Sequence, residues 1–157
     1  MTYPEPRSAD ERKADTLAKL REQEIDVWVA SASVSDLGSA QPYVVPLSLA
    51  WINERVVIAV ESDSRTAVNI MAHGVTRLAI GPTRDVVIID AVLDQVVSLD
   101  DAPAELTEGY AAQADWDPRA ARGRFVFIVL RPDRIQAWRE ANELPGRTLM
   151  RAGSWVV

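Results

Sequence analysis

The sequence predicts a mainly β, α+β fold, in which residues 1–157 form a single β-barrel of about six antiparallel strands with peripheral helices. Several short runs are rich in β-branched residues and are joined by hairpin-type connections. The helical segments do not alternate regularly with the strands, and no Gly-rich turn joins a strand to a helix, which disfavours a βαβ nucleotide-binding fold. A chain of 157 residues is long enough for one domain with a substantial core.

A central hairpin at residues 43–61 is expected to organise the barrel. Side chains point to alternate sides of a strand, so residues 43–51 have a bulky face and a small face. The bulky face carries Tyr43, Val45, Leu47, Leu49 and Trp51, and the small face carries Val44, Pro46, Ser48 and Ala50. Asn53-Glu54 then supplies a tight turn, and residues 55–61 form an almost wholly apolar strand. We expect the bulky face to enter the core and the small face to leave room for a flat ligand.

A short helix is predicted at residues 65–73, directly after this hairpin. Ser62, Asp63 and Ser64 are suited to cap its start, and Gly74 is suited to end it. Free backbone N–H groups, the positive end of the helix dipole and Arg65 in the first turn can together bind an anion. Spacing alone favours the alternative, in which Asp63 or Ser64 only caps the helix and Arg65 is solvated, because capping residues are common and phosphate sites are rare.

The other elements are predicted from local signals. Ser8 and Glu11 have the capping-box spacing, Pro103 is typical of a first helical turn, and Pro132 interrupts a strand or places it at an edge. In chain order we expect a loose arm (1–7), a helix (8–24), a strand (25–31), a loop (33–41), strands at 76–80 and 86–97, a helix (103–113), strands at 125–130 and 134–138, and an irregular tail (142–157). The apolar, Trp-containing tail is expected to dock on the barrel or on a partner subunit.

The composition excludes several function classes. The 17 basic and 23 acidic residues give a net charge of −6, which disfavours nucleic acid or an anionic membrane surface as a partner. There is no cysteine, and His73 is the single histidine, so thiolate chemistry, a Cys/His metal site and a Ser-His-Asp triad are disfavoured. The start has no apolar signal region and no apolar run could span a bilayer, so we expect a soluble, cytoplasmic protein.

Four phrases, in order and at sensible spacing, resemble one family. They are Pro-Leu-Ser-Leu-Ala-Trp at 46–51, Ser-Arg-Thr-Ala-Val-Asn-Ile at 64–70, Tyr110 with Trp116-Asp117-Pro118, and Arg-Pro-Asp-Arg-Ile-Gln-Ala-Trp at 131–138. Together they resemble the pyridoxamine 5′-phosphate oxidase-like, FMN-binding split-barrel proteins, and most closely the actinobacterial branch that uses flavin or the deazaflavin F420. The resemblance extends from about residue 12 to about residue 140.

The resemblance implies a split barrel, FMN or F420 as cofactor, and a homodimer with the flavin or deazaflavin ring at its interface. By position, Ser48 would lie near the ring, and Ser62, Ser64, Arg65, Thr66 and Asn69 near the phosphate. Thr66 replaces a common lysine and Glu61 a common threonine, which removes one charge-assisted phosphate contact and adds a carboxylate.

The resemblance also implies an activity, which is the transfer of hydride to or from a small planar organic substrate. The cofactor would carry the chemistry, so no dedicated catalytic acid or base is required. Two alternatives remain: a non-catalytic carrier or sensor of flavin, haem or another planar ligand, and a structural dimer with an empty pocket. Tyr110 and the tryptophans at 51, 116, 138 and 155 are expected to be structural, and Arg77 and Arg84 to be solvated or to reach a cofactor tail.

Overall fold

A computed structural model describes residues 2–157 and contains one mostly antiparallel sheet with three α-helices around it. The strands are β1 (Asp26–Val34), β2 (Ala40–Ser48), β3 (Ala50–Ile52), β4 (Arg55–Glu61), β5 (Val75–Ile80), β6 (Val86–Ser98), β7 (Phe125–Trp138), β8 (Thr148–Arg151) and β9 (Ser154–Trp155). The helices are α1 (Ala9–Leu20), α2 (Arg65–His73) and α3 (Ala104–Ala114), with short 3₁₀ turns at Pro118–Ala120 and Ala141–Glu143. The expectation of a mainly β barrel with peripheral helices is confirmed.

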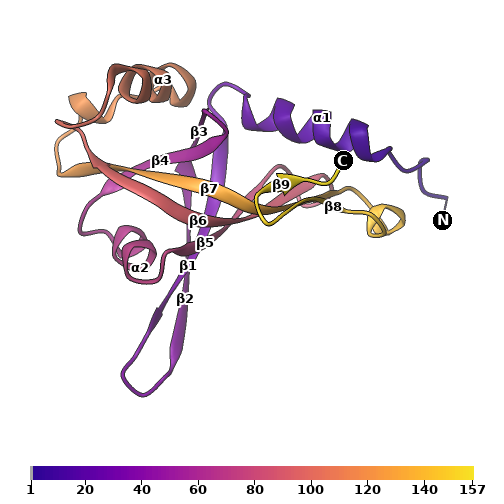
Figure 1. Ribbon diagram of the computed structural model, residues 1–157, viewed down its shortest axis with the longest axis horizontal. Coiled ribbons are helices and arrows are strands. Elements are labelled where there is room, and N and C mark those ends of the chain that lie inside the picture. Colours follow the sequence, from indigo (N-terminus) through magenta and orange to yellow (C-terminus); the bar gives the residue numbers. More distant parts are fainter. Residues whose placement is uncertain (1) are drawn as a thin grey trace.

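The strand order is β2-β1-β5-β6-β7-β4-β3, and each neighbouring pair is antiparallel. β7 is the hub of the sheet: β6 pairs with one edge along nearly its whole length, while β4 and β8 pair with the other edge. In Figure 1, α1 and α3 lie on one side of the sheet, α2 lies beside β5, and the β1–β2 hairpin projects away from the body. Because the hairpin projects, residues of both β1 and β2 are exposed to solvent.

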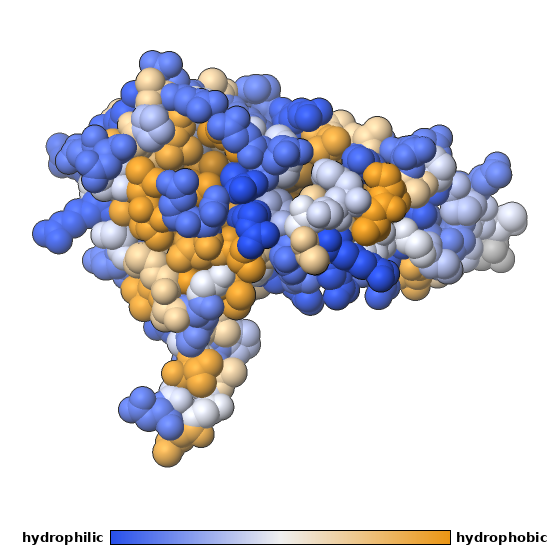
Figure 2. Space-filling view, in the orientation of Figure 1, coloured by the Kyte–Doolittle hydropathy of each residue, from blue (hydrophilic) through white to orange (hydrophobic). Residues whose placement is uncertain are grey.

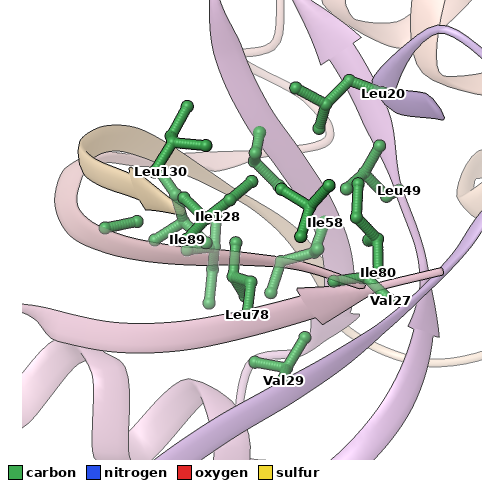
Figure 3. Close-up of a cluster of buried hydrophobic side chains, with 14 of the residues drawn as sticks. Leu20, Val27, Val29, Leu49, Ile58, Leu78, Ile80, Ile89, Ile128 and Leu130 are labelled. Atoms are coloured by element: carbon green, nitrogen blue, oxygen red, sulfur yellow. The ribbon is translucent and has the colours of Figure 1, made fainter. Parts of the chain in front are cut away.

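The main core consists of the inward-pointing residues of the strands. Figure 3 shows side chains from α1, β1, β4, β5, β6 and β7 meeting in one cluster. Its fully buried members include Leu20, Val29, Ile58, Ile89 and Leu130. The same strands supply alternate residues to the surface, as the period of two along a strand requires.

A second, smaller core lies under α3. Tyr110 and Phe127 are completely buried there, with ring centroids 5.3 Å apart in an edge-to-face arrangement. Trp116 packs edge-on against Tyr110 at 5.9 Å. The structural interpretation of Tyr110 is therefore confirmed.

Three local predictions were wrong. The helix predicted to reach residue 24 ends at Leu20, and Glu24 adopts a left-handed backbone with φ +59°. The strand predicted at 43–51 is interrupted at Leu49, because β2 pairs with β1 whereas β3 pairs with β4. The loop predicted at 33–41 is shorter, because β1 continues to Val34 and β2 starts at Ala40. The break at Leu49 depends on which strands pair, and alternation along the chain cannot show that.

The C-terminal tail, expected to be irregular, forms β8 and β9 on the edge of β7. The Pro132 segment does not break the strand; β7 is continuous, with a shift in its pairing to β6 around Asp133. Near the N-terminus, Arg7 donates to both carboxylate oxygens of Glu143, with its Nε and Nη2 at 3.0 and 2.7 Å. The two ends of the chain are thus joined by a buried ion pair.

Candidate functional site

The turn between β4 and α2 leads into a capped helix start. The Ser64 side chain accepts a hydrogen bond from the backbone N–H of Ala67 at 3.2 Å, which caps the helix. The helix ends at Gly74, whose φ of +71° is the left-handed conformation that glycine adopts without strain. The bounds predicted for this helix are confirmed, as is the capping role of Ser64. The backbone N–H groups of the first turn, ahead of the intrahelical hydrogen bonds, point out of its start.

Arg65 stands at the first position of this helix and is exposed. Its guanidinium carbon lies 5.5 Å from the centroid of the Tyr43 ring on β2, a cation–π distance. The stacking holds the charge over β2 and leaves the N–H donors at the edge of the guanidinium plane accessible. Arg65 is therefore neither purely solvated nor paired with a carboxylate.

Two of the residues predicted to lie near the phosphate are buried. Thr66 is 3% exposed and Asn69 is 4% exposed. The Asn69 amide donates to the Ser31 hydroxyl of β1 at 3.1 Å, which ties α2 to the sheet. In this conformation Ser62, Ser64 and Arg65 are the accessible members of the predicted set.

Ser48 lies away from this group. Ser48 is the last residue of β2 and pairs with Asp26, whereas Tyr43, which the Arg65 guanidinium contacts, lies five residues earlier on the same strand, a separation of about 17 Å. The Ser48 carbonyl accepts a hydrogen bond from the Tyr110 hydroxyl at 3.4 Å. The structure thus brings together the residues of the β4–α2 turn and places Ser48 where only an extended ligand could also reach it.

A second basic segment, which sequence analysis did not connect with this turn, lies beside it. The Ser62 N–H donates to the Arg124 carbonyl at 2.8 Å, and Glu61 pairs with Phe125. The loop just before β7 therefore carries exposed Arg122 and Arg124 next to the start of α2. About 60 residues separate the two segments in sequence, and only the β4–β7 pairing brings them together, so no local signal could have found them.

Glu61, the carboxylate that departs from the family pattern, lies against this loop. A Cβ atom at Gly123 would be 2.7 Å from its Oε1, so the glycine leaves the space that the carboxylate occupies. Its negative charge is thus close to the loop that carries the two arginines. Among residues 2–157, no cluster of three or more acidic or histidine side chains is arranged to hold a metal ion.

The other candidate cations are paired. Arg77 donates to Asp90 through its Nε at 2.6 Å, and Arg84 donates to Glu140 through its Nε at 2.8 Å. These exposed pairs contribute little to stability.

Apolar side chains are exposed around the projecting hairpin and α2. Figure 2 shows apolar surface between α3 and α2 and again along the hairpin. Over a third of each of these side chains is exposed: Trp28, Val34, Leu37 and Val44 on the hairpin, Val68 and Met71 on α2, Val75 on β5, and Val96 on β6. Trp28 is 53% exposed and Leu37 is 97% exposed. Exposed apolar surface of this kind is typical of a protein interface.

No protein-family model and no curated protein matches the chain. Solved structures do. An F420 reductase aligns with a TM-score of 0.54 at 18% identity, over 74% of this chain and 92% of the reductase. A putative pyridoxamine 5′-phosphate oxidase from Listeria innocua aligns with a TM-score of 0.57 at 13% identity, over 82% and 98% of the two chains. The chain has the pyridoxamine 5′-phosphate oxidase-like split-barrel fold.

A heme-binding protein from Mycobacterium smegmatis has the same split barrel, with a TM-score of 0.57 at 18% identity, over 90% of this chain and 57% of that one. The split barrel therefore occurs in solved proteins named for F420 and for heme. The fold alone does not identify a ligand for this chain. No helix within residues 2–157 is both long and apolar enough to span a membrane.

Proposed function

We propose that the protein binds FMN or the deazaflavin F420 at the interface of a homodimer and transfers hydride to or from a small planar organic substrate. The observation that carries the proposal is the start of α2. There a capped helix N-terminus and an exposed arginine stacked on Tyr43 lie together in a split barrel. Backbone N–H groups, the helix dipole and a guanidinium are together suited to a phosphate.

The phosphate would be held by Arg65, by the first-turn amides of α2 and by the hydroxyl of Ser62. Arg122 and Arg124 would supply the positive charge that the family's lysine provides where this chain has Thr66. Burial of Thr66 supports this substitution of roles, because its side chain does not reach the surface. Arg122 and Arg124 would also offset the Glu61 carboxylate beside the turn.

When bound, FMN or F420 would supply the hydride chemistry. The chain would bind and orient the cofactor and keep water from its ring. Tyr110 is not assigned as a proton donor, because its side chain is completely buried and would not contact a substrate. We therefore assign no catalytic acid or base.

The exposed apolar surface of the hairpin and α2 supports the proposed dimer. A monomer would leave Trp28, Val44 and Val68 in water, next to the β2 strand against which the ring would lie. A symmetric partner would cover these side chains and close the ring site from its open side.

A second candidate function is non-catalytic: a carrier or sensor of flavin, haem or another planar ligand. Two residues favour this non-catalytic function. Thr66 stands where the family often has a lysine, and Glu61 adds a carboxylate, so both weaken a phosphate site relative to the family pattern. The two functions predict the same fold and differ in turnover.

The deciding experiment is a fluorescence titration of FMN and F420 into the wild-type protein, Arg65→Ala and Arg21→Ala. Arg21 is an exposed arginine outside the site and serves as the matched control. We expect one cofactor to bind, Arg65→Ala to weaken it by about tenfold to a hundredfold, and Arg21→Ala to leave it unchanged. Equal affinity in all three proteins would overturn the phosphate site. Binding without turnover of the reduced cofactor across a substrate panel would favour the carrier.

A further inference from the structure

The outer edge of β7 is left open between two strands. β4 pairs with residues 125–130 on the edge opposite β6, and β8 pairs with Ile135 and Gln136 on that same edge. Among residues 2–157 no strand pairs with 131–134 there. A cavity of about 410 Å³ occupies this gap, between the β3–β4 turn and the β8–β9 turn.

The lining of the cavity combines aromatic and cationic side chains. Trp51 and Trp155 contribute two half-buried indoles from opposite sides of the gap, and Met150 adds a polarisable thioether. Arg131 also lines the cavity, and its guanidinium lies beside Gly153; Arg55 lines it too, with its guanidinium bound to Asp94. Large flat surfaces and forked donors in one cavity are suited to a planar ligand with a negative charge.

The charges favour an anion. Arg55 is paired with Asp94 at 2.9 Å, whereas no carboxylate oxygen of the described residues lies within ion-pair distance of Arg131. The one carboxylate that lines the cavity belongs to Glu54, which is exposed at the turn. The Lys13 ammonium lies 4.9 Å from the centroid of the Trp155 ring and donates a hydrogen bond to the Val157 oxygen at 2.8 Å, so it does not line the cavity.

Tight turns hold the two walls in place. Asn53 and Glu54 in one turn, and Ala152 and Gly153 in the other, have left-handed backbones with φ between +48° and +74°. The Gly153 N–H donates to the Asp133 carbonyl at 2.9 Å, which fixes the second turn to β7. A Cβ atom at Gly153 would lie 3.1 Å from Nη1 of Arg131, so the glycine lets the guanidinium lie directly against the turn.

We propose that this cavity is a binding site for a small planar aromatic anion, such as an aromatic carboxylate, with Arg131 binding the charge and the two indoles contacting the ring. The site is separate from the proposed cofactor site, because none of its residues belongs to α2, to the β1–β2 hairpin or to the loop before β7. It requires neither a bound cofactor nor turnover.

The test uses 1-naphthoate, titrated by calorimetry into the full-length protein. We expect saturable binding to the wild type, at least about tenfold weaker binding to Arg131→Gln and to Trp155→Leu, and unchanged binding to Arg151→Gln. Arg151 is the matched control, since it is an exposed arginine on β8 that does not line the cavity. Cyclohexanecarboxylate, which lacks the aromatic face, and 1-naphthylmethylamine, which reverses the charge, should both bind more weakly.

Indole N–H resonances in a ¹⁵N-labelled sample locate the bound naphthoate. The chain has five tryptophans, and the signals of Trp51 and Trp155 should shift while that of Trp116 does not. Absence of saturable binding, equal affinity in Arg131→Gln, or shifts confined to other indoles would each overturn the proposal. So would loss of FMN binding in Arg131→Gln, because it would place the cofactor in this cavity.

Discussion

The start of α2 and the gap on the edge of β7 are built in different ways. The first is assembled from neighbours in sequence, the cap Ser64 and the arginine that follows it, and it needs the rest of the chain only for Tyr43 and the loop before β7. The second takes its walls from β3, β4 and the C-terminal hairpin, which lie about 100 residues apart. A local site survives as long as its helix forms, whereas the gap exists only when β7 pairs correctly along its whole outer edge.

Both regions depend on β7, so substitutions along this strand can test whether they are independent. β4 and β8 pair with it on the same edge, so a defect in β7 acts on the turn before α2 and on the gap together. Changes at either end of the edge should affect one region and spare the other.

The largest expected effect is on global stability, from Leu130→Ala. Leu130 is fully buried and pairs with Val56 in β4, so its truncation leaves a cavity in the main core. We expect a loss of about 2–5 kcal/mol in the free energy of unfolding, measured by urea denaturation. Val156→Ala, at an exposed position near the C-terminus, should change it by less than about 0.5 kcal/mol. A loss in Leu130→Ala no larger than that of the control would contradict the placement of Leu130 in the core.

The local site was largely predictable from sequence, and the gap was not. Ser64, Arg65 and Gly74 indicated the helix and its start, because capping is decided by residues within one turn. The role of Arg124 could not be predicted, since it depends on the register that pairs Glu61 with Phe125.

The errors along the chain have the same cause. Residues 43–51 read as one strand by alternation, yet the chain changes partner at Leu49, where its N–H donates to the Ile25 carbonyl. The tail was predicted to be irregular because its strands are only two and four residues long. They are stabilised by the edge of β7 rather than by the β-propensity of their own residues. Burial of Asn69 likewise depends on a distant partner, Ser31.

A smaller but specific effect is expected from acid on the C-terminal region. Hydrogen bonds from the Arg7 side chain lower the pKa of Glu143 to about 2, against 4.5 for a free side chain. A carboxylate whose pKa is lower in the folded protein than in the unfolded chain stabilises the fold at every pH above its unfolded-state pKa. That contribution is lost as the pH falls from about 5 towards 2. The contribution to the free energy of unfolding at neutral pH is about 3 kcal/mol, because each tenfold change in a proton-binding constant corresponds to about 1.4 kcal/mol.

Glu143→Gln isolates this contribution. The variant should lose about that stability at pH 7 and should show a flatter decline than the wild type between pH 5 and pH 3, measured by urea unfolding at each pH. Because Glu143 lies just before β8, the loss should weaken naphthoate binding in the gap more than FMN binding at α2. Parallel pH profiles for the two proteins would show that the ion pair contributes nothing.

The helix cap should have a modest effect on stability that is confined to α2. Ser64→Ala removes the acceptor for the Ala67 N–H, and we expect a loss of about 1 kcal/mol in the free energy of unfolding. Ser62→Ala, two residues earlier and without a capping hydrogen bond, is the control and should leave stability unchanged. Amide hydrogen exchange should speed up in the first turn of α2 in the Ser64 variant and remain unchanged in β7. Faster exchange throughout the sheet would show that the start of α2 is not a local unit.

The smallest expected effect separates the two sources of positive charge at the α2 site. Arg124→Ala should weaken FMN or F420 binding by about threefold to tenfold, less than Arg65→Ala, because its side chain is exposed and salt screens it. The loss should shrink as salt is raised, whereas the loss in Arg65→Ala should persist, since direct hydrogen bonds to a phosphate are screened less. Glu61→Gln should act in the opposite direction and tighten binding, because it removes a negative charge beside the same loop. If Arg124→Ala and Glu61→Gln both leave the affinity unchanged, the loop before β7 takes no part in the site, and the anion is held by residues adjacent in sequence alone.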